Sequence, residues 1–203
     1  MPYLRSVEAK TALCLSGLTY IIGRRHPAIE LQPFTHSSGN LSLSRTILIL
    51  EARKWGAGHF LWIDADMVFR PTALVQLLAR RKDVIGANYA VRGTLTRPTA
   101  RGGGGYIYTT EAKAKAGEVE RAERMGLGLC LMKADLFDKI GPPWFGNVAQ
   151  PGGLEFGGED DFLFDTLAAA GVECFVDHAV SYMTGHLHER ILTNADTLAL
   201  LDT

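Results

Sequence analysis

The chain has 203 residues, enough for one large domain that buries most of its apolar surface. A hydrophobic fraction of 47% and a charged fraction of 21% are ordinary for a globular protein, and a net charge of −1 excludes a general attraction to nucleic acid or anionic membranes. No stretch reaches the roughly 20 apolar residues of a membrane span. The three cysteines are far apart and form no zinc pattern, which favours a reducing cytoplasm. We therefore predict one cytoplasmic domain over residues 1–203.

Helical and strand patterns alternate along the chain. In chain order we predict a helix over 7–22, a strand over 28–33, a helix over 41–55, a strand over 60–63, a helix over 72–81, strands over 84–89, 106–108 and 129–132, a helix over 134–140, a helix over 161–170, a strand over 174–176 and a helix over 189–201. The glycine-rich stretch 94–105 predicts a mobile loop, and the charged run 113–124 predicts a solvated face. This alternation predicts an α/β fold with a largely parallel sheet flanked by helices.

The most informative motif is Asp64-Ala65-Asp66, directly after the predicted strand 60–63. Residues i and i+2 of an extended segment point the same way, so we expect both carboxylates to project from the end of a strand. Two buried like charges are costly unless a cation lies between them, and Mg²⁺ and Mn²⁺ prefer carboxylate and phosphate oxygens. The motif therefore predicts a metal ion that holds phosphates. The alternative is a solvated acidic turn.

Two further clusters carry chemistry. Glu159-Asp160-Asp161 follows two glycines at a predicted helix start, where N-capping accounts for one or two acids but not easily for three. One of these carboxylates at the rim of a cleft is a candidate general base. His178, His186 and His188 form the second cluster, and neutral imidazole is a common ligand for Mn²⁺. A single histidine after a strand is more often a surface or core residue.

In their order and spacing, these motifs resemble the GT-A fold glycosyltransferases, especially small family 2-like enzymes of bacteria and phages. Asp64-Ala65-Asp66 is similar to the DXD motif of that family, and Gly158-Glu159-Asp160 is similar to its acidic ED motif. Gly185-His186 resembles the metal-ligand histidine, and Ser44-Arg45 resembles the Ala-Arg-Asn element of the nucleotide pocket. Met125-Gly126-Leu127-Gly128 resembles the glycine turn at the floor of the acceptor site. The resemblance implies a single Rossmann-like GT-A domain with a mostly parallel central sheet.

The resemblance also implies a donor site. A nucleotide-diphosphate sugar binds at the carboxyl ends of the strands with Mn²⁺ or Mg²⁺. Asp66 ligates the metal and His186 completes the metal site, with His188 as its rival. Asp64 contacts the ribose or the metal shell, and Arg45 helps to hold the nucleotide.

On the acceptor side, the resemblance implies that Asp160 deprotonates an acceptor hydroxyl and that the reaction inverts the anomeric centre. A retaining reaction is the alternative if Asp160 lies too far from that centre. Glu159 supports Asp160 or binds the acceptor. The glycine-rich loop at 102–105 could close over the donor, with a disordered surface connection as the alternative. The acceptor is a saccharide, a lipid, a protein or a modified base.

Two departures from the family pattern stand out. The opening strand is shortened or missing, because Met1-Pro2-Tyr3 corresponds only to its last residues. Position 46 is Thr where the Ala-Arg-Asn element carries Asn. Two other functions fit the same residues: a metal-dependent phosphohydrolase or nucleotidyltransferase, and a non-catalytic module that binds a sugar nucleotide. Neither the oligomeric state nor the donor sugar follows from the sequence.

Overall fold

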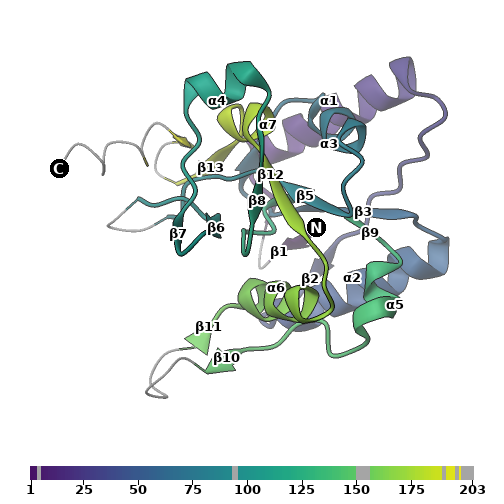
Figure 1. Cartoon of the computed structure of the whole chain (residues 1–203). Coiled ribbons are helices and arrows are strands. Elements are labelled where there is room, and N and C mark those ends of the chain that lie inside the picture. Colours follow the sequence, from purple (N-terminus) through teal and green to yellow (C-terminus); the bar gives the residue numbers. More distant parts are fainter. Residues whose placement is uncertain (4–5, 93–95, 150–155, 189–190, 195–196, 198–203) are drawn as a thin grey trace.

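The computed structural model describes the chain apart from residues 4–5, 93–95, 150–155, 189–190, 195–196 and 198–203 (Figure 1). The helices are α1 (Ala9–Arg25), α2 (Leu41–Trp55), α3 (Ala73–Ala79), α4 (Glu111–Ala116), α5 (Leu136–Ile140), α6 (Glu159–Ala169) and α7 (His178–Tyr182). The strands of the central sheet, in the order in which they pair, are β3 (His59–Ile63), β9 (Leu129–Lys133), β5 (Val84–Gly86), β12 (Cys174–Asp177) and β8 (Val119–Ala122). The short outer strands are β1 (Pro2–Tyr3), β2 (His36–Ser37), β4 (Met67–Val68), β6 (Arg101–Gly102), β7 (Gly105–Tyr106), β10 (Val148–Ala149), β11 (Phe156–Gly157), β13 (Gly185–Leu187) and β14 (Ile191–Leu192).

The central sheet is mixed, so the expected mostly parallel sheet is only partly matched. β12 pairs parallel with β5, whereas β9 runs antiparallel to both of its neighbours and β8 runs antiparallel to β12. β3, β5 and β12 therefore point in one direction and end at the same edge of the sheet. Loops that follow these three strands meet at that edge, as in other open α/β sheets.

Side chains along each strand point alternately to the two faces of the sheet, so a hydrophobic core forms on each face. Phe60 and Trp62 of β3 pack with α2, α5 and α6, whereas Ile63 packs on the opposite face with α1 and α3. In β9, Cys130 joins the first face and Leu129 the second. Figure 1 shows the sheet between these two helical layers. The domain is therefore α/β, and none of its described helices has the length and apolar character needed to cross a bilayer.

Most predicted elements lie where the sequence placed them, and the exceptions are instructive. The predicted strand 28–33 has no strand structure, and the charged run 113–124 contains α4 and β8 instead of one solvated face. Part of the expected glycine loop is a hairpin of β6 and β7, turned by two glycines with positive φ, Gly103 and Gly104. The predicted helix 189–201 is wrong at β14, and the rest of it falls largely outside the described residues.

Candidate functional site

The Asp64-Ala65-Asp66 motif forms a turn at the carboxyl end of β3. The strand ends at Ile63, and the chain re-enters a strand at β4, which pairs antiparallel with β13. The Asp66 carbonyl accepts a hydrogen bond of 2.8 Å from Leu187 N–H, and Met67 lies opposite His186. This pairing brings His186 to the motif across a wide sequence separation. The expectation that both carboxylates project together from a strand is corrected, because the turn gives each aspartate its own partners.

Arg45 is the buried centre of one half of the site. Its helix, α2, starts at the Asn40 cap, whose side chain accepts from Leu43 N–H at 3.0 Å. Although Arg45 is only 1% exposed, its guanidinium reaches three carboxylates. Nη2 is 3.1 Å from Asp64 Oδ1, and Nη1 is 3.0 Å from Glu159 Oε1 and also donates to Asp160 Oδ1. Burial alone would lower the pKa of Arg45, but the three carboxylates raise it, so this cation is permanent.

Asp160 is held from both sides. Arg45 donates to its Oδ1, and Leu127 N–H donates to its Oδ2 at 3.0 Å. Burial among other carboxylates raises the pKa of Asp160 to about 6, although Arg45 opposes this shift. About 27% of the Asp160 side chain remains accessible. The carboxyl is therefore fixed in place, reachable from outside and able to change its proton near neutral pH.

Glycines flank Leu127 because the turn around it packs closely against Tyr89. A Cβ on Gly126 would lie 2.2 Å from the Tyr89 hydroxyl oxygen, and one on Gly128 would lie 2.6 Å from it. The Gly128 N–H donates to that hydroxyl at 2.9 Å. Because the Tyr89 side chain packs directly against both glycines, the turn presents the Leu127 N–H to Asp160. The sequence motif was visible, but Tyr89 as its packing partner was not.

Asp66 and His186 form the other half of the site. His186 Nδ1 is 3.1 Å from the Ala90 carbonyl, which can only accept, so Nδ1 carries the proton. The other ring nitrogen, Nε2, lies 3.3 Å from Asp66 Oδ2. Two electron-rich atoms at this distance require a proton or a cation between them. A backbone carbonyl on the far nitrogen is also the usual arrangement for a metal-bound histidine.

The cation beside Asp66 is Arg92, whose Nη1 is 2.9 Å from Asp66 Oδ2. Burial would raise the pKa of Asp66, but the His186 hydrogen bond and the Arg92 charge outweigh it and lower that pKa. Asp66 is thus ionised and paired with the guanidinium of Arg92. The Arg92 side chain is 52% exposed, so it can leave at little cost.

We call the residues at this edge the strand-end site: Arg45, Asp64, Asp66, Glu159, Asp160 and His186. The structure brings together these six residues, to which the resemblance gave roles, in two groups joined by the turn at Asp64–Asp66. Among the described residues, His186 contacts Asp66 and no contact of His188 with Asp66 is found. Thr46 donates to the Ser42 carbonyl at 2.8 Å within α2, so its hydroxyl is already bound inside the helix.

A second acid–histidine group lies elsewhere: Glu118 immediately precedes β8, Glu120 lies within it, and His178 begins α7. The ligand atoms of Glu118, Glu120 and His178 lie within 4.8 Å of one another, so these residues could hold a metal ion. However, Lys113 Nζ lies 2.5 Å from Glu120 Oε2. His178 uses both ring nitrogens, at 2.9 Å from Thr109 Oγ1 and at 3.1 Å from Glu120 Oε2. We call these residues, with Lys113, the Lys113 cluster, since a lysine already fills the place of a cation.

Comparison with known proteins identifies the fold. No protein-family model matches the sequence, and no curated protein matches it. Among solved structures, A197 from STIV is similar with a TM-score of 0.62 and 16% identity, over 95% of this chain and 91% of that one. GalNAc-T7 with UDP, GalNAc and Mn²⁺ aligns with a TM-score of 0.49 and 16% identity, over 83% of this chain and 36% of that one. At these identities the likeness concerns the fold alone.

Proposed function

We propose that this protein is a metal-dependent glycosyltransferase, which moves a sugar from a nucleotide-diphosphate sugar to an acceptor hydroxyl. One observation carries the proposal. At the end of β3, an ionised Asp66 and an imidazole nitrogen face each other at 3.3 Å, next to a buried arginine that fixes a second, reachable carboxyl. The first pair suits a metal bound to a diphosphate, and the second suits proton transfer.

On the donor side, Asp66 and His186 Nε2 would hold the ion. Bound there, Mn²⁺ or Mg²⁺ would act as a Lewis acid that offsets charge on the leaving diphosphate. Two protein ligands leave positions for phosphate oxygens and water, as is usual for such ions, and a nitrogen ligand favours Mn²⁺. Asp64 is 28% exposed and pairs with Arg45, so its outer lone pairs can accept hydrogen bonds from ribose hydroxyls.

On the acceptor side, Asp160 takes the proton of the attacking hydroxyl. A pKa of about 6 leaves it mostly ionised at neutral pH and still basic enough to accept a proton. Arg45 holds Asp160 in place and limits how basic it becomes. Glu159 shares the same guanidinium and is placed to bind the acceptor. Attack assisted by a base on the acceptor side inverts the anomeric centre.

The test combines binding and turnover. A panel of nucleotide sugars is screened for Mn²⁺-dependent thermal stabilisation, since a ligand that binds the folded state raises its melting temperature. The stabilising donor is then incubated with and without candidate saccharide, lipid, protein and nucleobase acceptors. A transferase releases nucleotide faster with an acceptor and yields a glycosylated product. Equal release in water alone would indicate a hydrolase, and stabilisation without any turnover would indicate a binding module.

A further inference from the structure

Two exposed arginines lie over the ring of one tyrosine. The guanidinium carbon of Arg97 is 5.9 Å from the centre of the Tyr106 ring, and that of Arg101 is 5.3 Å from it. Arg101 and Tyr106 lie opposite each other in the hairpin of β6 and β7, beside β8 (Figure 1). We call Arg97, Arg101 and Tyr106 the Tyr106 platform. A guanidinium that stacks on an aromatic ring keeps its N–H groups free for a ligand.

The charges of these two arginines are not neutralised by carboxylates. Arg121 on the adjacent strand β8 has such a partner, because its Nη1 lies 3.4 Å from Glu173. Within the part of the chain that the structure describes, no carboxylate pairs with Arg97 or Arg101, whose contacts are with the Tyr106 ring. Two neighbouring cations repel each other, so an anion that bridges them is bound favourably.

A buried asparagine fixes the platform at the edge of the sheet that carries the strand-end site. Asn88 is fully buried and follows β5, which ends at the same edge as β3. Its amide nitrogen donates to the Ile107 carbonyl at 2.6 Å, and its Oδ1 accepts from the Ala100 N–H at 3.1 Å. Ile107 N–H in turn donates to the Ala100 carbonyl at 3.0 Å. Because these residues adjoin Arg101 and Tyr106, the platform is held in place before any ligand binds.

The platform adjoins the turn that holds Asp160. Thr99 lies between the two arginines in the sequence, and its methyl carbon is 3.3 Å from the position that a Cβ on Gly126 would occupy. The next residue, Leu127, donates its N–H to Asp160 Oδ2 at 3.0 Å. The platform therefore lies next to the candidate base and on the acceptor side of the strand-end site.

A second contact joins the platform to the start of α6. Arg101 N–H donates to the Arg124 carbonyl at 2.9 Å. The Arg124 guanidinium lies 3.5 Å from Asp161, the residue after Asp160. The hairpin is thus tied to the helix that carries the candidate base.

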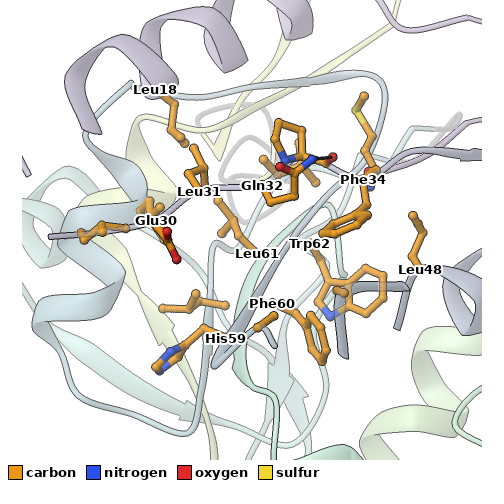
Figure 2. A pocket seen from close by; sticks show the side chains of 18 of the residues that line it. Leu18, Glu30, Leu31, Gln32, Phe34, Leu48, His59, Phe60, Leu61 and Trp62 are labelled. Atoms are coloured by element: carbon orange, nitrogen blue, oxygen red, sulfur yellow. Dashed lines mark hydrogen bonds between the residues drawn. The ribbon is translucent and has the colours of Figure 1, made fainter. Parts of the chain in front are cut away.

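The apolar pocket of the molecule offers no comparable place for an anion. This pocket of about 320 Å³ lies between β3, α1, α2 and the segment 29–35, and Leu18, Leu31 and Phe34 are among the side chains at its walls (Figure 2). An ionised phosphate is unfavourable in such surroundings. A charged acceptor therefore fits the Tyr106 platform better than the pocket.

We propose that the Tyr106 platform binds the phosphate group of the acceptor, and that the acceptor is a phosphate monoester such as a sugar phosphate. A phosphate monoester carries nearly two negative charges at neutral pH and has three free oxygens, which match two guanidinium groups. Held at Arg97 and Arg101, the acceptor presents a hydroxyl towards Asp160. The acceptor role rests on the proposed transferase function, whereas phosphate binding itself does not.

Binding is measured first, without donor or metal. Inorganic phosphate and glucose 6-phosphate are titrated into the whole chain, and the Nε–Hε signals of the arginines are followed by NMR. We expect the signals of Arg97 and Arg101 to shift. The double variant Arg97→Gln/Arg101→Gln should bind about tenfold more weakly or worse, since hydrogen bonds from two charged groups are lost.

Arg121→Gln is the matched control, because Arg121 is 70% exposed but already paired with Glu173. Equal affinity of this control and the double variant would overturn the proposal, as would arginine signals that do not shift. Tighter binding of a single-stranded oligonucleotide without a terminal phosphate than of glucose 6-phosphate would also overturn it, in favour of a nucleic-acid backbone.

Transfer then tests the acceptor role. Each sugar acceptor is compared with its phosphate monoester, using the donor and Mn²⁺. We expect Arg97→Gln/Arg101→Gln to lower kcat/KM for the monoester by about 10- to 100-fold and to abolish the preference for it over the unphosphorylated sugar. Transfer that is indifferent to the phosphate and to both substitutions would overturn the acceptor role but keep the transferase function. Phosphate binding without transfer to any acceptor would overturn the transferase function and the acceptor role together.

Discussion

The strand-end site and the Lys113 cluster use the same residue types but differ in what neutralises them. In the Lys113 cluster, Lys113 lies 2.5 Å from Glu120, and His178 is fully buried with both ring nitrogens bonded. In the strand-end site, His186 bonds through Nδ1 to a carbonyl and leaves Nε2 facing Asp66. Proximity of acids and histidines alone therefore does not distinguish the two groups. Both groups contain a cation, but the Lys113 side chain beside Glu120 is 31% exposed, whereas that of Arg92, 2.9 Å from Asp66, is 52% exposed.

The largest expected effect tests the catalytic half of the strand-end site. Asp160→Asn keeps the size of the side chain and most of its hydrogen bonds but removes the basic carboxylate. We expect transfer to fall by roughly 10²- to 10⁴-fold with donor binding little changed. Asp161→Asn is the control, because Asp161 lies next to Asp160 and pairs with Arg124 at 3.5 Å. If Asp160→Asn transfers sugar as fast as the wild-type protein and Asp161→Asn, Asp160 is not the catalytic base.

The next prediction compares carboxylates from the two groups. Asp66→Ala should weaken Mn²⁺-dependent nucleotide binding by about 100-fold or more, since a metal ligand is lost. Glu120→Gln should leave that binding unchanged, because Lys113 already serves as the cation for Glu120. Calorimetric titration of each variant with nucleotide, with and without Mn²⁺, measures the effect. If Glu120→Gln loses more Mn²⁺-dependent nucleotide binding than Asp66→Ala, the Lys113 cluster and not the strand-end site binds the metal.

The pKa of Asp160 predicts two pH dependences of opposite sign. The base must be ionised, so kcat should fall by about tenfold per pH unit as the pH drops below about 6. Stability behaves differently, because a pKa raised from 3.8 to about 6 means that the folded state binds this proton more tightly than the unfolded state. Its contribution to the free energy of unfolding should decrease as the pH rises from about 4 to about 6. Asp160→Asn should remove both slopes, and persistence of both would assign them to other groups.

The smallest expected effect concerns Arg92. Its guanidinium competes with a metal ion for Asp66, but its side chain is half exposed, so the ion pair is weak. Arg92→Ala should raise the affinity for Mn²⁺ alone by only about two- to fivefold. Arg97→Ala is the matched control, because Arg97 is exposed and stacks on Tyr106 instead. Unchanged or weaker Mn²⁺ binding in Arg92→Ala would show that Arg92 does not compete.

Much of the fold could be predicted, because local signals were strong. Asn40 and Gly56 bracket α2 at the predicted residues, and the apolar run at β3 is short and aromatic. The direction of β9 could not be read from sequence, since a fully buried strand has the same pattern in either direction. α4 was missed although Thr110 caps it through Lys113 N–H and Gly117 ends it with positive φ, so charge content outweighed visible capping signals.

The sequence predicted which residues lie near the end of β3, but not how they are grouped there. Family resemblance pointed to Arg45, Asp66, Asp160 and His186, and these four lie at the predicted edge of the sheet. The separation of Asp64 from Asp66 depends on the strand ending at Ile63, one residue before the motif. Likewise, the segment 28–33 has strand composition but lacks strand pairing, because the adjacent space beside β3 is a pocket. Composition predicts a tendency to form a strand, and the neighbouring segments decide whether the strand forms.

The central claim is that the strand-end site, and not the Lys113 cluster, binds the metal ion. Pulsed electron paramagnetic resonance of bound Mn²⁺ detects a coordinated histidine nitrogen directly. We predict a nitrogen signal in the wild-type protein that persists in His178→Ala and disappears in His186→Ala, with metal affinity reduced by roughly 10- to 100-fold in the latter. A signal that persists in His186→Ala and disappears in His178→Ala would contradict the account.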